Sequence, residues 1–210
     1  MSIAEKSTRK CIPLESGDRL TRAEFERRYS ARPDIKKAEL IEGVVYVASP
    51  VSTEEHGTPH FHLAPWLGVF VAKTPGVIPA IDSTVRLDTD NEVQPGLFLA
   101  LDRDHGGGTA LAEGYLEGAP DLVVEVAASS ASHDLNAKMH VYRRNGVREY
   151  LVWQIYEGRL DWFQLNAEGV YETVPAGAAG VIESEVFPGL RLDVPALLRG
   201  DLAAVLAAVG

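Results

Sequence analysis

A glutamate in the middle of an apolar stretch is the residue whose setting most suggests chemistry. Residues 119–129 read APDLVVEVAAS, with apolar side chains on both sides of Glu125. Such a run is typical of a strand that is buried on both faces. Because an isolated charge is costly to remove from water, we predict that Glu125 has a partner.

That partner cannot be the other acidic residue of the same strand. Asp121 and Glu125 share one face, but four residues separate them by about 13 Å at roughly 3.3 Å per residue. Oxygen ligands of Mg or Ca lie about 2.0 to 2.6 Å from the ion. A second ligand must therefore come from a neighbouring element.

Six segments, in this order, resemble the bacterial Uma-type proteins, a group of putative restriction endonucleases in the PD-(D/E)XK superfamily. They extend from about Glu39 to Leu197 and read ELIEG, SPVSTEEHG, VQPG, APDLVVEVAASS, HDLNAKMHVYRRNGVREYLVW and FPGLRLDV. The resemblance implies an α/β restriction-endonuclease-like fold, with a mixed sheet flanked by helices. It also implies a hydrolase in which Asp, Glu and Lys surround Mg or Mn and water attacks a DNA phosphodiester.

Carried over by position, the resemblance assigns roles to three residues of this chain. Glu125 is the metal-binding glutamate of the central strand, and Glu39 is an additional metal ligand from the first hairpin. Lys138 is the catalytic lysine, displaced onto the following helix, where it neutralises charge on the phosphate. The motif Asp belongs at Gly96, where this chain has no side chain.

The loss at Gly96 predicts an endonuclease with weakened or absent activity. A second carboxylate of typical members is replaced by Gln154. Asp82, Asp88 or Asp90 could fill the vacancy, water could replace the carboxylate oxygen, or the metal could be lost. The alternative function is a non-catalytic member that keeps the fold to bind DNA or a protein.

Each site residue also has an interpretation without catalysis. Glu125 could form a structural ion pair with Lys138 or with an arginine. Lys138, four residues after Asp134, could be half of a surface helix pair. Arg143, Arg144 and Arg148 could contact DNA phosphates or simply stabilise a helix C-terminus.

The histidines near residue 60 raise a metal alternative. His56 and His60 have the i, i+4 spacing of zinc ligands on a helix, and His62 is close by. The general-base Glu of the metalloprotease pattern would fall at Gly57, and Pro59 interrupts the turn. The pattern therefore favours a capped helix start with incidental histidines.

Composition limits the remaining classes. The chain has 210 residues, a formal charge of −10 and one cysteine. It lacks 18 consecutive apolar residues and an apolar signal region, which predicts a cytoplasmic protein with no membrane segment. The negative charge argues mildly against DNA as a binding partner, because it repels nucleic acid at long range. We also predict a homodimer, because symmetric homodimers are the commonest oligomers.

The predicted organisation is a mobile segment 1–20 followed by one domain, 21–210. Thr21 and Glu24, and then Ser52 and Glu55, have the spacing of helix capping boxes. The remaining predicted elements are a hairpin at 38–49, strands within 76–88, 92–101 and 120–126, a loop at 102–114, a helix at 132–146, a β-meander at 148–174 and a helical tail interrupted at Gly200.

Overall fold

The computed structural model of the protein describes residues 12–210. Its α-helices are α1 (Arg22–Ser30), α2 (Thr58–Val71), α3 (Ala131–His133), α4 (Met139–Asn145), α5 (Val194–Leu198) and α6 (Leu202–Ala207). Its strands are β1 (Ala38–Ile41), β2 (Val44–Val47), β3 (Val77–Ile81), β4 (Val85–Arg86), β5 (Glu92–Val93), β6 (Leu97–Leu101), β7 (Ala110–Ala112), β8 (Tyr115–Glu117), β9 (Leu122–Ala127), β10 (Glu149–Gln154), β11 (Arg159–Leu165), β12 (Tyr171–Thr173), β13 (Val181–Glu183) and β14 (Arg191–Asp193). Two π-helical turns, Thr53–Gly57 and Asp134–Lys138, lead into α2 and α4.

The central sheet has the strand order β12-β11-β10-β9-β6-β3. Only β9 and β10 pair in parallel, with Val152 opposite Glu125, and the other neighbours are antiparallel. Strand β9 lies inside the sheet and all six of its residues are buried. The predicted mixed α/β fold with a C-terminal meander is confirmed, and Glu125 lies on a central strand.

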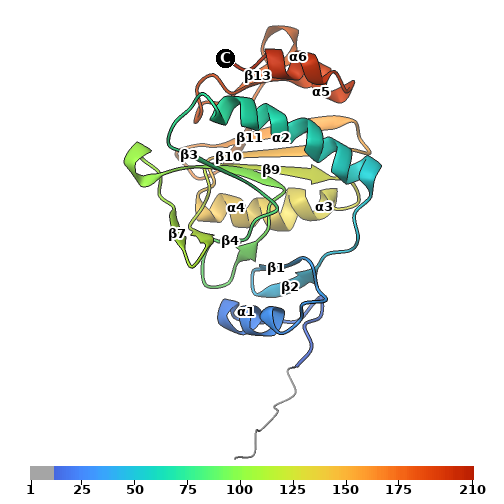
Figure 1. Ribbon diagram of the computed structural model, residues 1–210, viewed down its shortest axis with the longest axis vertical. Helices are drawn as coiled ribbons and strands as arrows, with labels where there is room; N and C mark the ends of the chain where they lie inside the picture. The colour runs from blue at the N-terminus through green and yellow to red at the C-terminus, as the bar shows by residue number, and fades with distance from the viewer. Residues whose placement is uncertain (1–11) are drawn as a thin grey trace, which may run out of the picture.

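Helices cover both faces of the central sheet (Figure 1). Helix α2 packs on one face, where Trp66 and Leu63 meet Val124 of β9 and residues of the C-terminal hairpin and helices. Helix α4 packs on the other face, where Val141 and Tyr142 join Val123. Because side chains alternate along a strand, Glu125 points toward the α4 face, as Val123 does.

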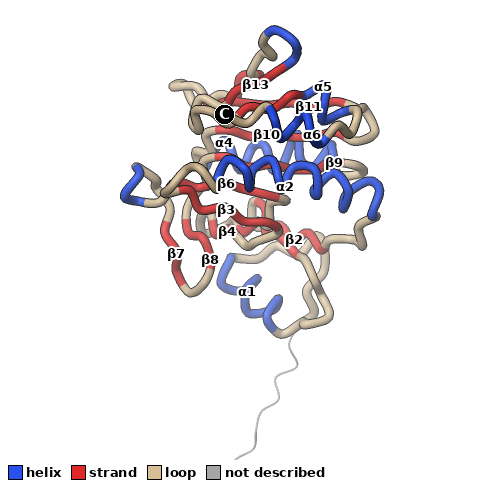
Figure 2. Tube along the Cα trace, turned by 45° about the horizontal axis from the view of Figure 1, so that its top comes forward, coloured by secondary structure: helices blue, strands red, loops and turns tan. Residues whose placement is uncertain are grey.

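A second sheet, with the order β2-β1-β5-β4-β8-β7, lies beside α4 and carries α1 (Figures 1 and 2). Ile41, Val85 and Val93 of this sheet pack in the same apolar cluster as Val123 and Tyr142. The first hairpin, which contains Glu39, is therefore brought to the face of β9 that carries Glu125.

Short sequence patterns, such as helix caps and turns, predicted most of these elements correctly. The hydroxyl oxygens of Thr21 and Ser52 accept hydrogen bonds from the N–H groups of Glu24 and Glu55, as their capping spacing predicts. The hairpin turns at Glu42 and Gly43, both with positive φ.

The region expected to be a plain loop, residues 102–114, differs from the prediction. It contains a 3₁₀ turn, Arg103–His105, and strand β7, which pairs with β8. The Ala-Leu-Ala segment of β7 is too short to give a sequence signal, and its pairing with β8 supplies the backbone partners that define it.

The N-terminal residues divide into two parts. Residues 1–11 of the predicted mobile segment 1–20 lie outside the described residues. Leu14 is buried against Phe25, and the N–H groups of Gly17 and Leu20 donate to the carbonyls of Val45 and Gly43. Residues 12–20 are therefore attached to the first hairpin. The extent of a single domain, 21–210, stays a prediction.

Among residues 12–210, none of the helices has the length and apolar character needed to cross a membrane.

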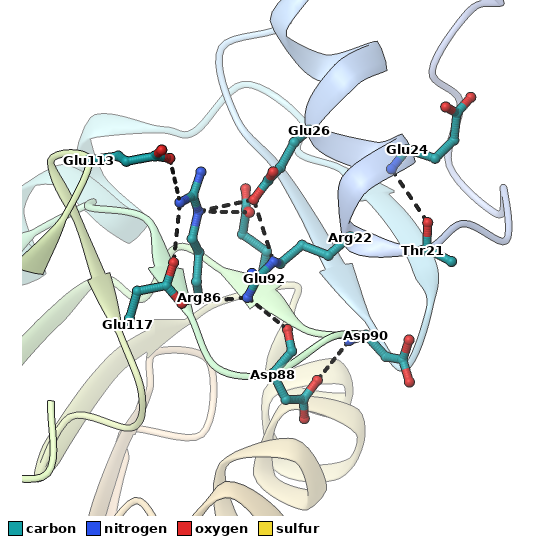
Figure 3. Close-up of polar contacts among 10 residues, drawn as sticks. All are labelled: Thr21, Arg22, Glu24, Glu26, Arg86, Asp88, Asp90, Glu92, Glu113 and Glu117. Atoms are coloured by element: carbon teal, nitrogen blue, oxygen red, sulfur yellow. Dashed lines mark hydrogen bonds and ion pairs between the residues drawn. The ribbon is translucent and has the colours of Figure 1, made fainter. Parts of the chain in front are cut away.

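A cluster of charged side chains joins α1 to the second sheet (Figure 3). The Nε atom of Arg86 lies 3.0 Å from Oε1 of Glu26 and 3.7 Å from Oε2 of Glu92. Arg22, Glu113 and Glu117 complete the cluster. Glu92 is only 5% exposed, and burial together with a hydrogen bond to Glu26 raises the pKa of Glu92 to about 8.

We expect Glu92 to make the protein less stable as the pH rises. The folded chain holds the Glu92 proton more tightly than the unfolded chain, whose ordinary pKa is 4.5. The stabilising contribution of this proton is thus complete below pH 4.5 and is lost as the pH rises toward about 8. The Glu92→Gln variant keeps an uncharged group there, so its free energy of unfolding should decline less than that of the native chain between these values.

Urea unfolding at several pH values measures this difference. Glu113→Gln is the matched control, because Glu113 contacts the same Arg86 but its side chain is 81% exposed. If the two variants show the same pH dependence, Glu92 is not the titrating group.

Candidate functional site

The structure pairs Glu125 with Lys138, one of the partners that the sequence left open. The Lys138 Nζ atom lies 2.7 Å from Oε1 of Glu125, and the hydroxyl of Tyr142 donates to the same oxygen at 3.0 Å. Lys138 and Tyr142 are four residues apart, so the helix places both on one face toward β9. The exposed fractions of Glu125 and Lys138 are 5% and 3%, so the interpretation of Lys138 as a surface residue is wrong.

Two further carboxylates surround the Lys138 ammonium. Oε1 of Glu39 lies 3.1 Å from Nζ, and Oδ1 of Asp134 lies 3.7 Å from it. Glu39 comes from β1, where its Oε1 also accepts a hydrogen bond from the N–H of Gln94. Asp134 begins the π-helical turn that ends at Lys138. Such turns occur frequently at functional sites.

The electrostatics of this group follow from burial and mutual contact. Burial opposes the charge on Lys138, but its three carboxylate neighbours outweigh that effect and raise the pKa of Lys138 well above the usual value. Burial likewise opposes ionisation of Glu125, but Lys138 and Lys37 produce a net lowering of its pKa. Burial and repulsion from Glu125 raise the pKa of Asp134 to about 6. Lys138 and Glu125 are therefore both charged near neutral pH.

Gly96 lies directly beside Glu125. Its N–H donates to Oε2 of Glu125 at 3.2 Å, immediately before Leu97 pairs with Val124. The backbone of Gly96 does not have the positive φ that favours glycine. A Cβ atom at this position would lie 2.8 Å from Cε1 and Nε2 of the His60 ring. The imidazole of His60 thus fills the space that a side chain at position 96 would need.

Of the three aspartates considered for the vacancy, Asp82 is the one next to Gly96. The N–H of Asp82 donates to the carbonyl of Gly96 at 3.0 Å. Asp88 instead accepts hydrogen bonds from Asn91 and Arg144, and the carbonyl of Asp90 accepts from Gly43. Neither of these two takes part in the contacts of Gly96.

Asp82 gathers with two of the histidines. One potential metal-ligand atom from each of His56, His60 and Asp82 lies within 4.8 Å of the other two. The ring centroids of His56 and His60 are 4.1 Å apart. Pro59 sits in the first turn of α2 and does not interrupt the alignment, because the helix tolerates proline there. The i, i+4 spacing was the sequence signal for the two histidines, but the aspartate comes from another element, at the residue after β3.

The remaining predicted residues do not join the site. The amide of Gln154 donates to Asp161 on the neighbouring strand. Arg143 donates to the carbonyl of Gly169, Arg144 pairs with Asp88, and Arg148 donates two hydrogen bonds to Asp121. Each arginine has an intramolecular partner, so phosphate contact by this set stays a prediction.

A magnesium ion held jointly by Glu39 and Glu125 does not fit this arrangement. The Lys138 ammonium lies between the two Oε1 atoms, and Gly96 provides no third carboxylate. Magnesium requires oxygen ligands at about 2.0 to 2.1 Å in nearly octahedral geometry. The oxygen that faces position 96 is Oε2 of Glu125, which accepts the backbone N–H of Gly96.

We expect Lys138→Met to lower the free energy of unfolding by about 3 to 5 kcal/mol, because it leaves buried carboxylates without their cation. Chemical denaturation at pH 7 measures the effect. Lys36→Met is the control, since Lys36 is exposed. Equal stabilities of the two variants would show that the Lys138 cluster contributes no net stabilisation to the fold.

Comparisons with known proteins agree with this architecture. No curated protein matches the chain. A solved structure, described as a putative nuclease belonging to DUF820 from Anabaena variabilis ATCC 29413, is similar with a TM-score of 0.63 and 13% sequence identity. The similarity covers 82% of this chain and 96% of that chain and shows the shared fold. The Uma2 family, described as "Putative restriction endonuclease", matches residues 22–195. Because this match spans most of the 210 residues, the chain belongs to the Uma2 family.

Proposed function

We propose that the protein is a DNA endonuclease of low Mg-supported activity, in which Gly96 is the weak point of the site. The family and the nuclease-like fold support the class of reaction, hydrolysis of a phosphodiester. The observation that carries the proposal is the contact between the Gly96 N–H and Glu125. This contact supports the proposal because the position predicted for the motif Asp lies directly beside the carboxylate of Glu125.

In this proposal Glu125 is the catalytic carboxylate and Lys138 is a positioning residue. The Lys138 ammonium keeps Glu125 ionised and fixes its Oε1, together with Tyr142. Lys138 is 3% exposed and is surrounded by carboxylates, so direct contact with phosphate would require these ion pairs to separate. Glu39 supports the same ammonium from the first hairpin.

A second candidate function is a non-catalytic member that binds DNA or a protein. The observation in its favour is the enclosure of Lys138, because three carboxylates surround its single positive charge. A buried ion cluster of this kind can specify a fold without doing chemistry.

Cleavage of supercoiled plasmid with Mg separates the two functions. Gly96→Asp alone would place its Cβ against the His60 ring, so the informative variant combines Gly96→Asp with His60→Ala. We expect this double variant to cut at least about tenfold faster than the native chain, a barrier reduction of about 1.4 kcal/mol. Asp at position 96 would supply the oxygen ligand beside Glu125.

The matched control adds Glu125→Gln to the double variant and should abolish the gained cleavage. His60→Ala alone tests whether the gain comes merely from the opened space. If the double variant cuts no faster than the native chain, Gly96 does not limit activity. If no variant cuts, binding of duplex DNA, measured across salt concentrations, tests the second candidate.

The proposal includes a cytoplasmic homodimer, which would suit a two-stranded substrate with pseudo-twofold symmetry. Light scattering should give twice the mass of one chain. A mass of about 22.8 kDa, that of a single chain, would remove the dimer from the proposal.

A further inference from the structure

His56, His60 and Asp82 bring three potential metal ligands to the end of the sheet where Gly96 lies. His56 comes from the π-helical turn before α2, His60 from the first turns of α2, and Asp82 from the residue after β3. Their donor atoms are within 4.8 Å of one another. Two imidazoles and one carboxylate from three adjoining segments thus meet in one place.

His60 gives an independent sign that this place binds a ligand. Its side chain is buried, with 8% of the residue exposed, yet Nε2 has no hydrogen-bond partner. A buried polar atom without a partner costs free energy and needs an explanation, such as an ion that the site binds. Nε2 is also one of the two ring atoms nearest to a Cβ built on Gly96, so it points to the space beside Glu125.

The protonation of the two histidines suits metal binding. Burial lowers the pKa of His60 to about 4, and it lowers the pKa of His56 as well. Both imidazoles are therefore neutral at pH 7 and keep a lone pair for coordination. Asp82 and Glu125 act on both rings in the opposite direction, which places negative charge around the position of a cation.

The backbone at Asp82 has an uncommon conformation. Asp82 has φ of 46°, a left-handed conformation that few residues other than glycine adopt. Its carboxylate lies 3.5 Å from Nζ of Lys37, and the Asp82 side chain is 52% exposed. The carboxylate can therefore move toward the imidazoles when its ion pair with Lys37 breaks.

The ligand types select the kind of metal ion. Magnesium prefers oxygen ligands, whereas imidazole suits zinc, copper, iron and nickel. A tetrahedral zinc ion with ligands at about 2.0 to 2.2 Å needs ligand atoms roughly 3.3 Å apart. The three ligand atoms now lie within 4.8 Å of one another, so modest side-chain rotations would bring them to that distance. Three protein ligands leave one position open for water or substrate, as in catalytic zinc sites.

We propose that His56, His60 and Asp82 bind one divalent transition-metal ion of the zinc type. The site replaces the carboxylate lost at Gly96 with an imidazole, since the His60 ring occupies the space of the missing side chain. Metal binding of this kind is independent of whether the protein cuts DNA.

Equilibrium dialysis against Zn²⁺, with Co²⁺ absorption spectra as a second measurement, tests the proposal on the full chain. The native protein should bind one ion, and Mg²⁺ in excess should not displace it. His56→Ala, His60→Ala and Asp82→Asn should each weaken binding by at least about tenfold, since even outer contacts of metal sites contribute that much. Asn tolerates the left-handed backbone at position 82, so Asp82→Asn remains informative if His60→Ala unfolds.

Two variants on neighbouring positions make the test specific. His62→Ala, on the same helix but outside the group, should leave binding unchanged. Lys37→Met should tighten binding, because it frees Asp82 and removes a like charge. Absence of Zn²⁺ binding, or binding that survives loss of His60 and Asp82, would overturn the proposal.

The plasmid assay gives a separate answer. A protein that binds Zn²⁺ through these residues but never cuts DNA would support this inference and contradict the proposed endonuclease. Cleavage with Mg²⁺ by a protein that binds no Zn²⁺ would support the proposed endonuclease and contradict this inference.

Discussion

The buried ammonium of Lys138 is the group on which the geometry of the site depends. Taking a charge out of water is expensive, and the cost is offset only when good partners surround it. Those partners are Glu125 on β9, Glu39 on β1 and Asp134 in the turn before α4. One cation therefore connects the central sheet, the first hairpin and the helix between β9 and β10. The same contacts hold Glu125 ionised beside Gly96, the residue before β6.

The space beside Glu125 is a second constraint on the site, because it has room for only one side chain. Either a residue at position 96 or the ring of His60 can fill it, since a Cβ on Gly96 would overlap that ring. Glycine at position 96 is thus what allows an imidazole from another element to occupy this space. Asp82 and His56 lie close to the same ring, so in the proposed metal site two of the three ligand atoms are nitrogen rather than oxygen.

Local patterns were enough for most of the elements. Caps at Thr21 and Ser52, the turn at Gly43 and the alternation of the meander all act over a few residues, so they can be recognised without knowing the fold. Strand β7 escaped prediction because its definition depends on pairing with β8. Arg143 and Arg144 in the last turn of α4 and Arg148 after it have the composition of a phosphate site, but in the fold each one contacts a different part of the chain.

The sequence by itself determined that Glu125 lies in a buried strand and needs a partner, because an unpaired carboxylate is too costly there. The order of its segments also indicated the Uma-type family, which the family match confirms, and predicted a departure from the motif at Gly96. Only the tertiary structure decided that Lys138 has three carboxylates around it and that Asp82, rather than Asp88 or Asp90, lies beside Gly96. The reason is physical: these contacts join residues far apart in the chain, and sheet pairing and helix packing bring them together.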